Sequence, residues 1–401
     1  MADNYILAGG AFVLPDRFVE GGTLVVREGR ICRIGREALP EHLSTNPGDG
    51  DLPVIDCSGS LVLPRLVEMH IHGAFGIGFE NVAGGEDILE VARRLERRGV
   101  GCFVPTILWD EGAVERLVAA IEASGLPEAV IPGIYIEGPF IDPKHRGGIN
   151  LPQIDAPDAD LCGKIVDTAR GRLRIMALAP ELPGIEALYP ILRENGVLIS
   201  LGHSGASASV ALPPPPFSVT HLYNAMSGLD HRGGGGGLVN VALSGSPAWT
   251  ELNADGIHVN GSCMKVASLC VPPERLILTS DAVISAGLDY GEYRYFGKSV
   301  TSRTNGVRYS ETGTLIGSNK LGIQIALSYM AATGASLPSA IASMSRAPAA
   351  ALGLAISDHG GGIEEGAPAD LFIWDRSLTS CRRPCEPNPE TKGYSRDNPT
   401  R

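Results

Sequence analysis

LVLPRLVEMHIHG, residues 61–73, is an apolar run that ends in two histidines with one residue between them, His70 and His72. In a β-strand, side chains alternate between the two faces, so residues i and i+2 point the same way. Both imidazoles then emerge together at the carboxyl end of one strand, where they can supply two nitrogen ligands to a metal ion. Because His-x-His also occurs by chance, the prediction depends on whether later strands bring further ligands to the same point.

Later apolar runs repeat this form, and most of them end in a polar residue capable of chemistry. They span residues 101–106, 131–136, 173–178, 197–202, 217–220, 249–253 and 275–280. Helical-looking segments lie between several of them, for example at 86–98 and 111–124. Together with the His70 strand, this series predicts an α/β fold, a (β/α)8 barrel of the TIM type, whose active site gathers at the carboxyl ends of the strands. We therefore expect Glu137, His203, His221 and Asp281, which follow four of these runs, to meet in space.

The composition is that of a water-soluble enzyme. A chain of 401 residues, 44% of them hydrophobic, can bury a large core and has room for one barrel and a small additional domain. The formal net charge of −12 disfavours nucleic acid and anionic membranes as partners. The first residues lack a basic region followed by an apolar core, and no apolar run approaches the length of a membrane span. The eight cysteines show no close CxxC pairing, so a reducing, cytoplasmic location is expected.

The two flanks of the barrel predict a second, smaller unit. Residues 1–60 contain short strand-like runs separated by glycine-containing breaks, and residues 369–374 read as one more strand. We expect a small β-sandwich made of residues 1–60 and 346–375, beside a barrel of residues 61–345. Residues 376–401 are polar and rich in Pro, Asn and Arg, and they are expected to be a disordered tail.

Several motifs carry a resemblance to a known family over residues 24–375. They are HIHG (70–73), EGPF (137–140), LAPE (178–181), GHS (202–204), HLYNAM (221–226), DGIH (255–258), TSDA (279–282) and GTLIGS (313–318). The chain resembles the amidohydrolase superfamily and, within it, the N-acetylglucosamine-6-phosphate deacetylase family. The barrel histidines are typical of the whole superfamily, whereas EGPF, HLYNAM and DGIH in this order are much narrower.

The resemblance implies metal-dependent hydrolysis of the N-acetyl group of N-acetylglucosamine 6-phosphate, which gives glucosamine 6-phosphate and acetate. It implies that Glu137, His203 and His221 hold one divalent ion, and that His70 and His72 add a second ion bridged through Glu137. Amide hydrolysis needs an activated water, a polarised carbonyl and a proton for the leaving amine, and a metal ion supplies the first two. Zinc and iron both suit imidazole and carboxylate ligands.

The resemblance also assigns the remaining site residues. Asp281 would take a proton from the attacking water and pass it to the departing nitrogen. Asn224 and the backbone of Ala225 would contact the sugar phosphate, and His258 would contact the sugar or its phosphate. Arg232 stands where the family places a phosphate-binding arginine, which is often offered to the neighbouring subunit's site, and a bidentate guanidinium fits a phosphate well. A homodimer is therefore expected.

Each of these residues also has an ordinary structural interpretation. His70 and His72 could be strand histidines without a ligand, and Asp281 could be the N-cap of the following segment. Glu137 could cap a turn, but a glutamate directly after apolar positions is costly to bury unless it is paired or metal-bound. Arg232 could be one of many surface arginines. The combined pattern of strand ends favours the metal site.

The chain departs from the family at five places, one of which is the glycine run at 233–237, where the family has a proline after the phosphate-binding arginine. PGFID before the histidine pair is here Pro64 to Glu68, with Arg65 in place of the glycine. A substrate-contacting histidine is replaced by Ile149, with which neither His145 nor Asn150 is aligned. Prolines 213–216 cannot continue a helix, so the crossover before His221 must be short or irregular. Finally, the closing strand that the family has after residue 375 has no counterpart in the sequence pattern.

Three interpretations remain open at this point. The first is the sugar-phosphate deacetylase. The second is another amidohydrolase, which acts on a cyclic amide or an N-acyl amino acid. The third is a barrel protein that has lost catalysis and keeps a binding role. Retention of four histidines, Glu137 and Asp281 argues against the third, because an eroded enzyme usually loses such a set.

Overall fold

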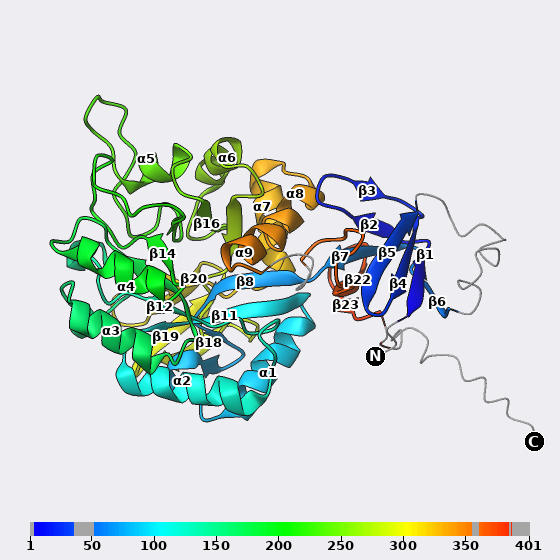
Figure 1. The fold of residues 1–401 in the computed structure, drawn as a ribbon, viewed down its shortest axis with the longest axis horizontal. Coiled ribbons are helices and arrows are strands. Elements are labelled where there is room, and N and C mark those ends of the chain that lie inside the picture. Colours follow the sequence, from blue (N-terminus) through cyan, green and yellow to red (C-terminus); the bar gives the residue numbers. More distant parts are fainter. Residues whose placement is uncertain (1–3, 36–51, 355–360, 385, 387–401) are drawn as a thin grey trace, which may run out of the picture.

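A parallel sheet of eight strands forms the larger part of the structure, a computed structural model that describes residues 4–35, 52–354, 361–384 and 386. Each strand pairs with the next one along the chain, as a (β/α)8 barrel requires (Figure 1). The strands are β8 (Leu66–Ile71), β11 (Val100–Leu108), β12 (Ile134–Glu137), β13 (Leu173–Leu178), β14 (Leu198–Leu201), β15 (Ser218–Val219), β16 (Trp249–Asn253) and β17 (Leu276–Thr279). The predicted strand series and the predicted fold class are confirmed.

The barrel closes between its first and last strands, β8 and β17. At the carboxyl end, the Asp281 amide donates to the His70 carbonyl at 3.0 Å, and Ile71 forms a parallel bridge with Ala282. At the amino end, the carbonyls of Ser343 and Met344 accept from the amides of Leu278 and Val67 respectively. The turn between α8 (Leu337–Ala342) and α9 (Arg346–Ala351) therefore fills the gap at one end of the barrel, while direct pairing holds the carboxyl end together.

Helices cover the outside of the barrel. They are α1 (Gly85–Glu96), α2 (Glu111–Ser124), α3 (Ala159–Thr168), α4 (Leu188–Glu194), α5 (Leu238–Leu243), α6 (Gly261–Cys270), α7 (Ile323–Thr333), α8 (Leu337–Ala342) and α9 (Arg346–Ala351), with short 3-10 turns η2 (Phe79–Asn81), η3 (Pro143–His145), η4 (Leu151–Gln153) and η5 (Ile185–Ala187). α2 begins where the Asp110 carboxylate accepts from the Ala113 amide, and it ends at Gly125 with φ of 67°. Its apolar face, which includes Leu117 and Ile121, packs into the core. Among the described helices, none has the length and apolar character that a bilayer crossing requires.

No helix lies between β14 and β15, and this crossover contains prolines 213–216. The predicted irregular connection is confirmed. The physical reason is that proline lacks the amide hydrogen that an α-helix needs in its interior.

A smaller domain of two sheets lies beside the barrel (Figure 1). One sheet has the order β5 (Arg30–Gly35), β4 (Thr23–Arg27), β1 (Tyr5–Ala8), β6 (Val54–Asp56), and the other has the order β23 (Cys381–Arg382), β22 (Leu371–Asp375), β7 (Ser60–Pro64), β2 (Ala11–Val13), β3 (Phe18–Val19). Buried side chains from both sheets, among them Leu7, Phe12 and Ile373, form one apolar cluster. β7 continues into β8 after a single residue, so residues 61–73 serve both domains.

β23 corrects the expectation that no strand follows residue 375. Its two residues pair antiparallel with β22, Ile373 opposite Arg382. The turn between them is held by the Asp375 carboxylate, which accepts from the hydroxyls of Ser377 and Thr379. This local pairing of an acid with hydroxyl groups has no hydrophobic periodicity, so the strand pattern did not reveal it. Residues 387–401 of the expected tail lie outside the described residues.

Arg65, which stands where the resemblance expects glycine, joins the two domains. Its buried guanidinium donates to the Ala129 carbonyl at 2.7 Å and lies 3.1 Å from an Asp370 carboxylate oxygen. Asp370 also pairs with Arg383, whose Nε lies 2.7 Å from Glu96 of α1. The substitution is therefore accommodated by an ion-pair network between barrel and sandwich, away from the carboxyl ends of the strands.

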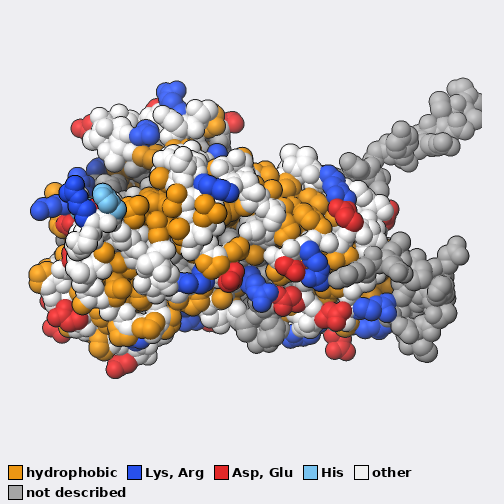
Figure 2. Space-filling model, turned by 90° about the horizontal axis from the view of Figure 1, so that it is seen from above, with side chains coloured by type: hydrophobic (Ala, Val, Ile, Leu, Met, Phe, Trp, Pro, Cys, Tyr) orange, Lys and Arg blue, Asp and Glu red, His pale blue; other side chains and the backbone are white. Residues whose placement is uncertain are grey.

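On the face drawn in Figure 2, basic and acidic side chains are interspersed, with hydrophobic side chains between them.

A four-stranded antiparallel sheet follows β17, and the sequence analysis did not predict it. It consists of β18 (Gly291–Tyr295), β19 (Lys298–Arg303), β20 (Gly306–Tyr309) and β21 (Leu315–Gly317). Two further short strands, β9 (Gly73–Ala74) and β10 (Ile77–Gly78), pair just after the histidine motif. The β18–β19 turn places Phe296 and Gly297 at positive φ, as a two-residue hairpin loop requires. Asn305-Gly306, at the β19–β20 turn and the start of β20, is a hairpin signal that could have been used.

Candidate metal centre and active site

The carboxyl ends of five barrel strands bring six metal-binding side chains together. His70 lies on β8 and Glu137 on β12, whereas His72 follows β8 directly and the other three lie two residues past the ends of β14, β15 and β17. They form two groups, which are His70, His72 and Asp281, and Glu137, His203 and His221. In each group, one candidate ligand atom per residue lies within 4.8 Å of the others.

The Glu137 group is the tighter of the two. His203 Nε2 and His221 Nε2 lie 2.9 and 3.0 Å from the same Glu137 oxygen, Oε1, and 3.0 Å from each other. All three side chains are buried. Two imidazoles and one carboxylate are a common ligand set for zinc and iron.

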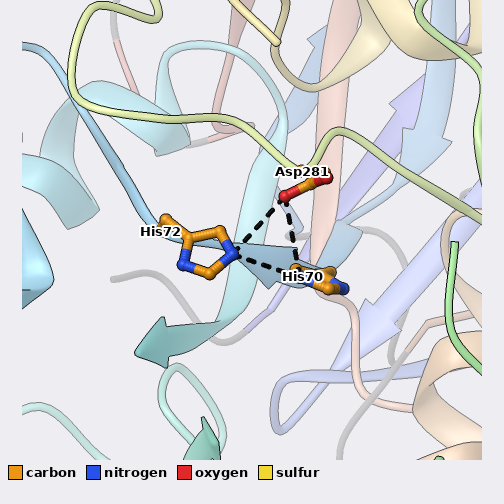
Figure 3. A group of neighbouring side chains, drawn as sticks. All are labelled: His70, His72 and Asp281. Atoms are coloured by element: carbon orange, nitrogen blue, oxygen red, sulfur yellow. Dashed lines mark hydrogen bonds and ion pairs between the residues drawn. The ribbon is translucent and has the colours of Figure 1, made fainter. Parts of the chain in front are cut away.

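His70, His72 and Asp281 point toward one another across the mouth of the barrel (Figure 3). The two Nε2 atoms are 3.3 Å apart, and Asp281 Oδ1 lies 3.6 Å from that of His70 and 3.5 Å from that of His72. Glu137 Oε2 lies 3.3 Å from His72 Nε2. Because the other oxygen of Glu137 contacts His203 and His221, this carboxylate lies between the two groups, where it can bridge two ions.

Hydrogen bonds on the far side of two imidazoles determine which nitrogen faces the centre. His203 Nδ1 lies 3.0 Å from the His145 carbonyl, which can only accept, so Nδ1 carries the hydrogen. His70 Nδ1 lies 3.0 Å from a carboxylate oxygen of Glu251. Such partners leave the Nε2 lone pair directed at the metal.

The convergence of these atoms fits a bound cation. In neutral His203, the unprotonated Nε2 faces the Glu137 carboxylate, so an acceptor faces an acceptor at 2.9 Å. Two acceptors at hydrogen-bond distance are stabilised only by a proton or a metal ion between them. The donor set, four imidazoles and two carboxylates, is the chemistry that a divalent transition metal prefers.

The pKa shifts of three side chains also indicate that the site favours a bound positive charge. Burial alone would lower the pKa of His70, but the Asp281 and Glu251 carboxylates outweigh it and raise this pKa to about 10. Burial would raise the pKa of Glu137, but the neighbouring histidines, His203 above all, hold it well below its usual range. His70 and His72 likewise outweigh burial and lower the pKa of Asp281, so it is a carboxylate at neutral pH.

Several site residues occupy the left-handed region of backbone conformation. The φ angles of His203, His221, Ala225 and Asp281 are 47°, 27°, 47° and 50°. Non-glycine residues rarely adopt such angles, and they cluster at functional sites where the surrounding structure holds them. Here the Asp142 amide donates to the His203 carbonyl at 2.8 Å. The strand ends thus turn sharply enough to aim their first side chains into the barrel mouth.

A cavity of about 210 Å³ opens over the metal-binding side chains. Its polar floor includes His72, Glu137, His203, His221 and Asp281. Its other walls are largely apolar and aromatic, formed by Leu108, Ile149, Tyr295, Phe296, Tyr309, Leu315 and Ile316. Most of these wall residues belong to the β18–β21 sheet and its turns, which the sequence analysis missed, although the alternation in residues 291–295 and the Asn305-Gly306 pair were signals for it.

Three of the four expected substrate-binding residues line this cavity, namely Asn224, Ala225 and His258. His258 Nδ1 lies 2.8 Å from an Asp255 oxygen, which leaves its other nitrogen for a ligand. Arg232 is not among the lining residues; it is exposed on the loop before α5, and its amide donates to Asp230 at 3.1 Å. Within this chain the structure therefore does not bring Arg232 to the cavity.

Ile149 occupies a cavity wall, where it packs in an apolar cluster with Leu108 and Ile141. His145 does not replace the missing histidine within the cavity lining, because its Nδ1 is paired with Asp142 at 2.7 Å. Asn150 does not line the cavity either; it lies 3.2 Å from Gln153. The wall in which the resemblance implies a substrate-contacting histidine is thus apolar here.

Comparisons with known proteins agree with this geometry, although no family model matches the chain. The chain is 31% identical over 400 residues to N-acetylglucosamine-6-phosphate deacetylase from Bacillus subtilis (strain 168), covering 95% of this chain and 97% of that protein. It is 32% identical to the human protein of the same name, covering 92% and 94%. It is 31% identical to N-acetylgalactosamine-6-phosphate deacetylase from Escherichia coli O157:H7, covering 81% and 86%.

Solved structures share the fold over nearly the whole chain. The crystal structure of N-acetylglucosamine-6-phosphate deacetylase from Pasteurella multocida superposes with a TM-score of 0.83 at 24% identity, covering 94% of this chain and 97% of that one. A mutant of the Mycobacterium smegmatis enzyme in complex with N-acetyl-D-glucosamine-6-phosphate gives 0.80 at 24% identity, covering 96% and 98%. Sequence and fold together show that this chain belongs to the N-acetylglucosamine-6-phosphate deacetylase family of the amidohydrolase superfamily.

Proposed function

We propose that this chain hydrolyses the N-acetyl group of N-acetylglucosamine 6-phosphate to give glucosamine 6-phosphate and acetate, in amino-sugar catabolism. The observation that carries the proposal is the pair of ligand groups around Glu137 at the floor of one cavity. The identity to deacetylases over nearly the whole chain supports this reaction over that of an amidohydrolase acting on a cyclic amide or an N-acyl amino acid. It also disfavours a binding protein without catalysis.

In this proposal Glu137, His203 and His221 hold one divalent ion, and His70 and His72 hold a second, with Glu137 shared. The ions are zinc or iron, both of which suit these ligands. When bound, they acidify a water molecule and polarise the amide carbonyl of the substrate.

Asp281 moves the protons of the reaction. Its lowered pKa keeps it ionised at neutral pH, so it can accept a proton from the attacking water. It then donates this proton to the amine nitrogen as the C–N bond breaks. One carboxyl group that acts first as a base and then as an acid must lie beside both the attacking water and the leaving nitrogen. Its position at the cavity floor, within the group of His70 and His72, supports this role.

Asn224, the backbone of Ala225 and His258 bind the sugar phosphate from the cavity wall. Arg232 binds the phosphate in the neighbouring subunit's cavity, so the active unit is a homodimer. The exposed position of Arg232, outside the cavity of its own chain, is consistent with this arrangement. The rest of the proposal is a cytoplasmic enzyme with a barrel of residues 61–345 and with flanks 1–60 and 346–375 in the sandwich, to which β23 adds residues 381–382.

The proposed function is tested by measuring release of free amine from N-acetylglucosamine 6-phosphate by protein reconstituted with zinc or iron. N-acetylgalactosamine 6-phosphate and unphosphorylated N-acetylglucosamine are assayed alongside, because one relative is named for the galactosamine isomer. We expect turnover of N-acetylglucosamine 6-phosphate and at most slow turnover of unphosphorylated N-acetylglucosamine. Turnover of N-acetylgalactosamine 6-phosphate alone would reassign the substrate. If metal-loaded protein turns over none of the three, the proposed function is contradicted.

Replacement of the proposed phosphate ligand tests the substrate class. We expect Arg232→Ala to raise KM for the phosphorylated substrate by about tenfold or more, because a charge-assisted contact to phosphate contributes roughly 1.5–3 kcal/mol. KM for the unphosphorylated sugar should stay within about twofold. Arg97→Ala, which removes an exposed arginine at the end of α1, is the matched control and should change neither value. Equal effects of Arg232→Ala on both substrates would remove this residue from the phosphate site.

A further inference from the structure

Two of the buried polar side chains on β16, Glu251 and Asn253, belong to neither ligand group but contact one of them. They are two residues apart, so they emerge on the same face of the strand. Both are completely buried, and each contacts a different member of the His70, His72 and Asp281 group.

Glu251 lies behind His70. Its Oε2 is 3.0 Å from His70 Nδ1, while His70 Nε2, on the opposite side of the ring, faces His72 and Asp281. The Thr220 hydroxyl donates to the same Glu251 oxygen at 3.1 Å, which fixes the carboxylate in place. The other oxygen, Oε1, has no hydrogen-bond partner among the described residues.

A fully buried carboxylate with one unpartnered oxygen is costly unless positive charge lies nearby. The groups that face it are the His70 ring and the Thr220 hydroxyl, and of these only the ring can carry positive charge. A carboxylate bound to the outer nitrogen of an imidazole fixes its tautomer and makes the inner nitrogen a stronger ligand. The burial of Glu251 is therefore explained by positive charge at His70, which either a proton on the ring or a cation at its inner nitrogen supplies.

Asn253 holds Asp281 in the same way. Its Nδ2 donates to Asp281 Oδ2 at 3.0 Å, and the remaining Asp281 oxygen, Oδ1, lies about equally far from the two imidazoles, at 3.6 and 3.5 Å. The amide thus determines which oxygen of Asp281 faces the ligand group. The structure shows no comparable contact from β16 to the Glu137, His203 and His221 group among the described side chains.

We propose that β16 positions the second metal ion through Glu251 and Asn253, which orient His70 and Asp281 without touching the ion or the substrate. The proposal rests on the proposed two-ion site, and it makes the two ions separable. The ion at Glu137, His203 and His221 has its own support, the His145 carbonyl behind His203. Loss of Glu251 should therefore weaken one ion and spare the other.

The test is zinc binding, measured by chelator competition on the full chain. We expect two tight equivalents in the unmodified protein. In Glu251→Gln, one equivalent should remain tight and the other should weaken by about 10–100-fold, the usual effect of losing such an outer carboxylate. Thr220→Val removes the second contact of the same oxygen and should weaken the same equivalent by a smaller factor. It keeps the proposal testable if Glu251→Gln does not fold.

Glu68→Gln is the matched control. Glu68 is also a buried carboxylate in the barrel, and it accepts from the Thr279 hydroxyl and from the backbone amides of Ser280 and His70, but it contacts no imidazole nitrogen among the described residues. This variant should keep both zinc equivalents tight.

Asn253→Leu tests the contact to Asp281 by steady-state kinetics. In this variant kcat should fall by about tenfold or more, while KM stays within about twofold of its value in the unmodified protein.

Unchanged zinc affinities in Glu251→Gln would overturn the proposal, and so would equal weakening of both equivalents. A single equivalent in the unmodified protein would overturn it as well, whereas deacetylation by that protein would leave the proposed function intact. The opposite result is also informative. If the unmodified protein binds both zinc equivalents and Glu251→Gln weakens only one of them, but the unmodified protein does not deacetylate the substrate, then the role of β16 stands and the proposed function is contradicted. Zinc binding and turnover therefore distinguish the two proposals.

Discussion

Asp281→Asn should lower kcat by about 10²–10⁴-fold, the range that a positioned acid–base group contributes, while at least the ion of the Glu137 group stays bound. The asparagine has nearly the same shape but cannot accept a proton from water or return one to the leaving nitrogen. The bond from Asn253 Nδ2 requires an oxygen at that position, which the new amide can still present. We expect KM to change much less than kcat, because Asp281 acts on the reaction and not on the sugar phosphate.

The measurement is steady-state turnover together with metal content by elemental analysis on the same sample. Asp142→Asn is a suitable control, because Asp142 is also an aspartate paired with a histidine, His145, but it is not in either ligand group. It should retain most of the activity. Activity of Asp281→Asn close to that of the unmodified chain would contradict the assigned proton transfer.

Glu137→Ala should remove both ions and reduce turnover to the uncatalysed background. Its two oxygens face different groups, Oε1 toward His203 and His221 and Oε2 toward His72. Truncation therefore takes one ligand from each ion and leaves the imidazoles without the negative charge that compensates a cation. His70→Ala, in contrast, should remove only the ion of its own group.

Metal content per chain after dialysis distinguishes these outcomes, and thermal unfolding by circular dichroism shows whether the variants fold. We expect close to no ion in Glu137→Ala and one ion in His70→Ala. Replacement of an exposed glutamate, Glu86→Ala on α1, controls for loss of negative charge elsewhere and should keep both ions. Retention of one tight ion in Glu137→Ala would show that the carboxylate does not bridge the two groups.

The barrel could be predicted because its signals are local. Each buried strand is a short apolar run, and the residue that follows it lies at the active-site end whatever the neighbouring strands are. His70 and His72 share a face because strand periodicity is two, and His203, His221 and Asp281 each follow an apolar run directly. The strand predicted at 369–374 corresponds to β22, and the strand-like runs predicted within residues 1–60 correspond to strands such as β1 and β4.

Three features were missed or left unexplained. The β18–β21 sheet, which forms most of the apolar cavity wall, is exposed on alternate positions and has no long buried run, so its signals were only the alternation in residues 291–295 and the Asn305-Gly306 pair. β23 depends on hydroxyl contacts to Asp375. Arg65 appeared only as a departure from glycine, and its role became clear when Asp370, 305 positions away in the chain, was found beside it.

The sequence by itself determined which side chains lie at the active-site end of the barrel, because alternation along a strand and the direction of parallel strands are local properties. Only the tertiary structure decided how they are combined: that Glu137 faces both groups, that Glu251 and Asn253 stand behind His70 and Asp281, and that Arg232 lies outside its own cavity. These relations depend on the register and closure of eight strands, in which residues up to 211 positions apart, such as Glu68 and Thr279, come into hydrogen-bond contact. Strand periodicity contains no information about such distances, and the packing of the whole barrel sets them.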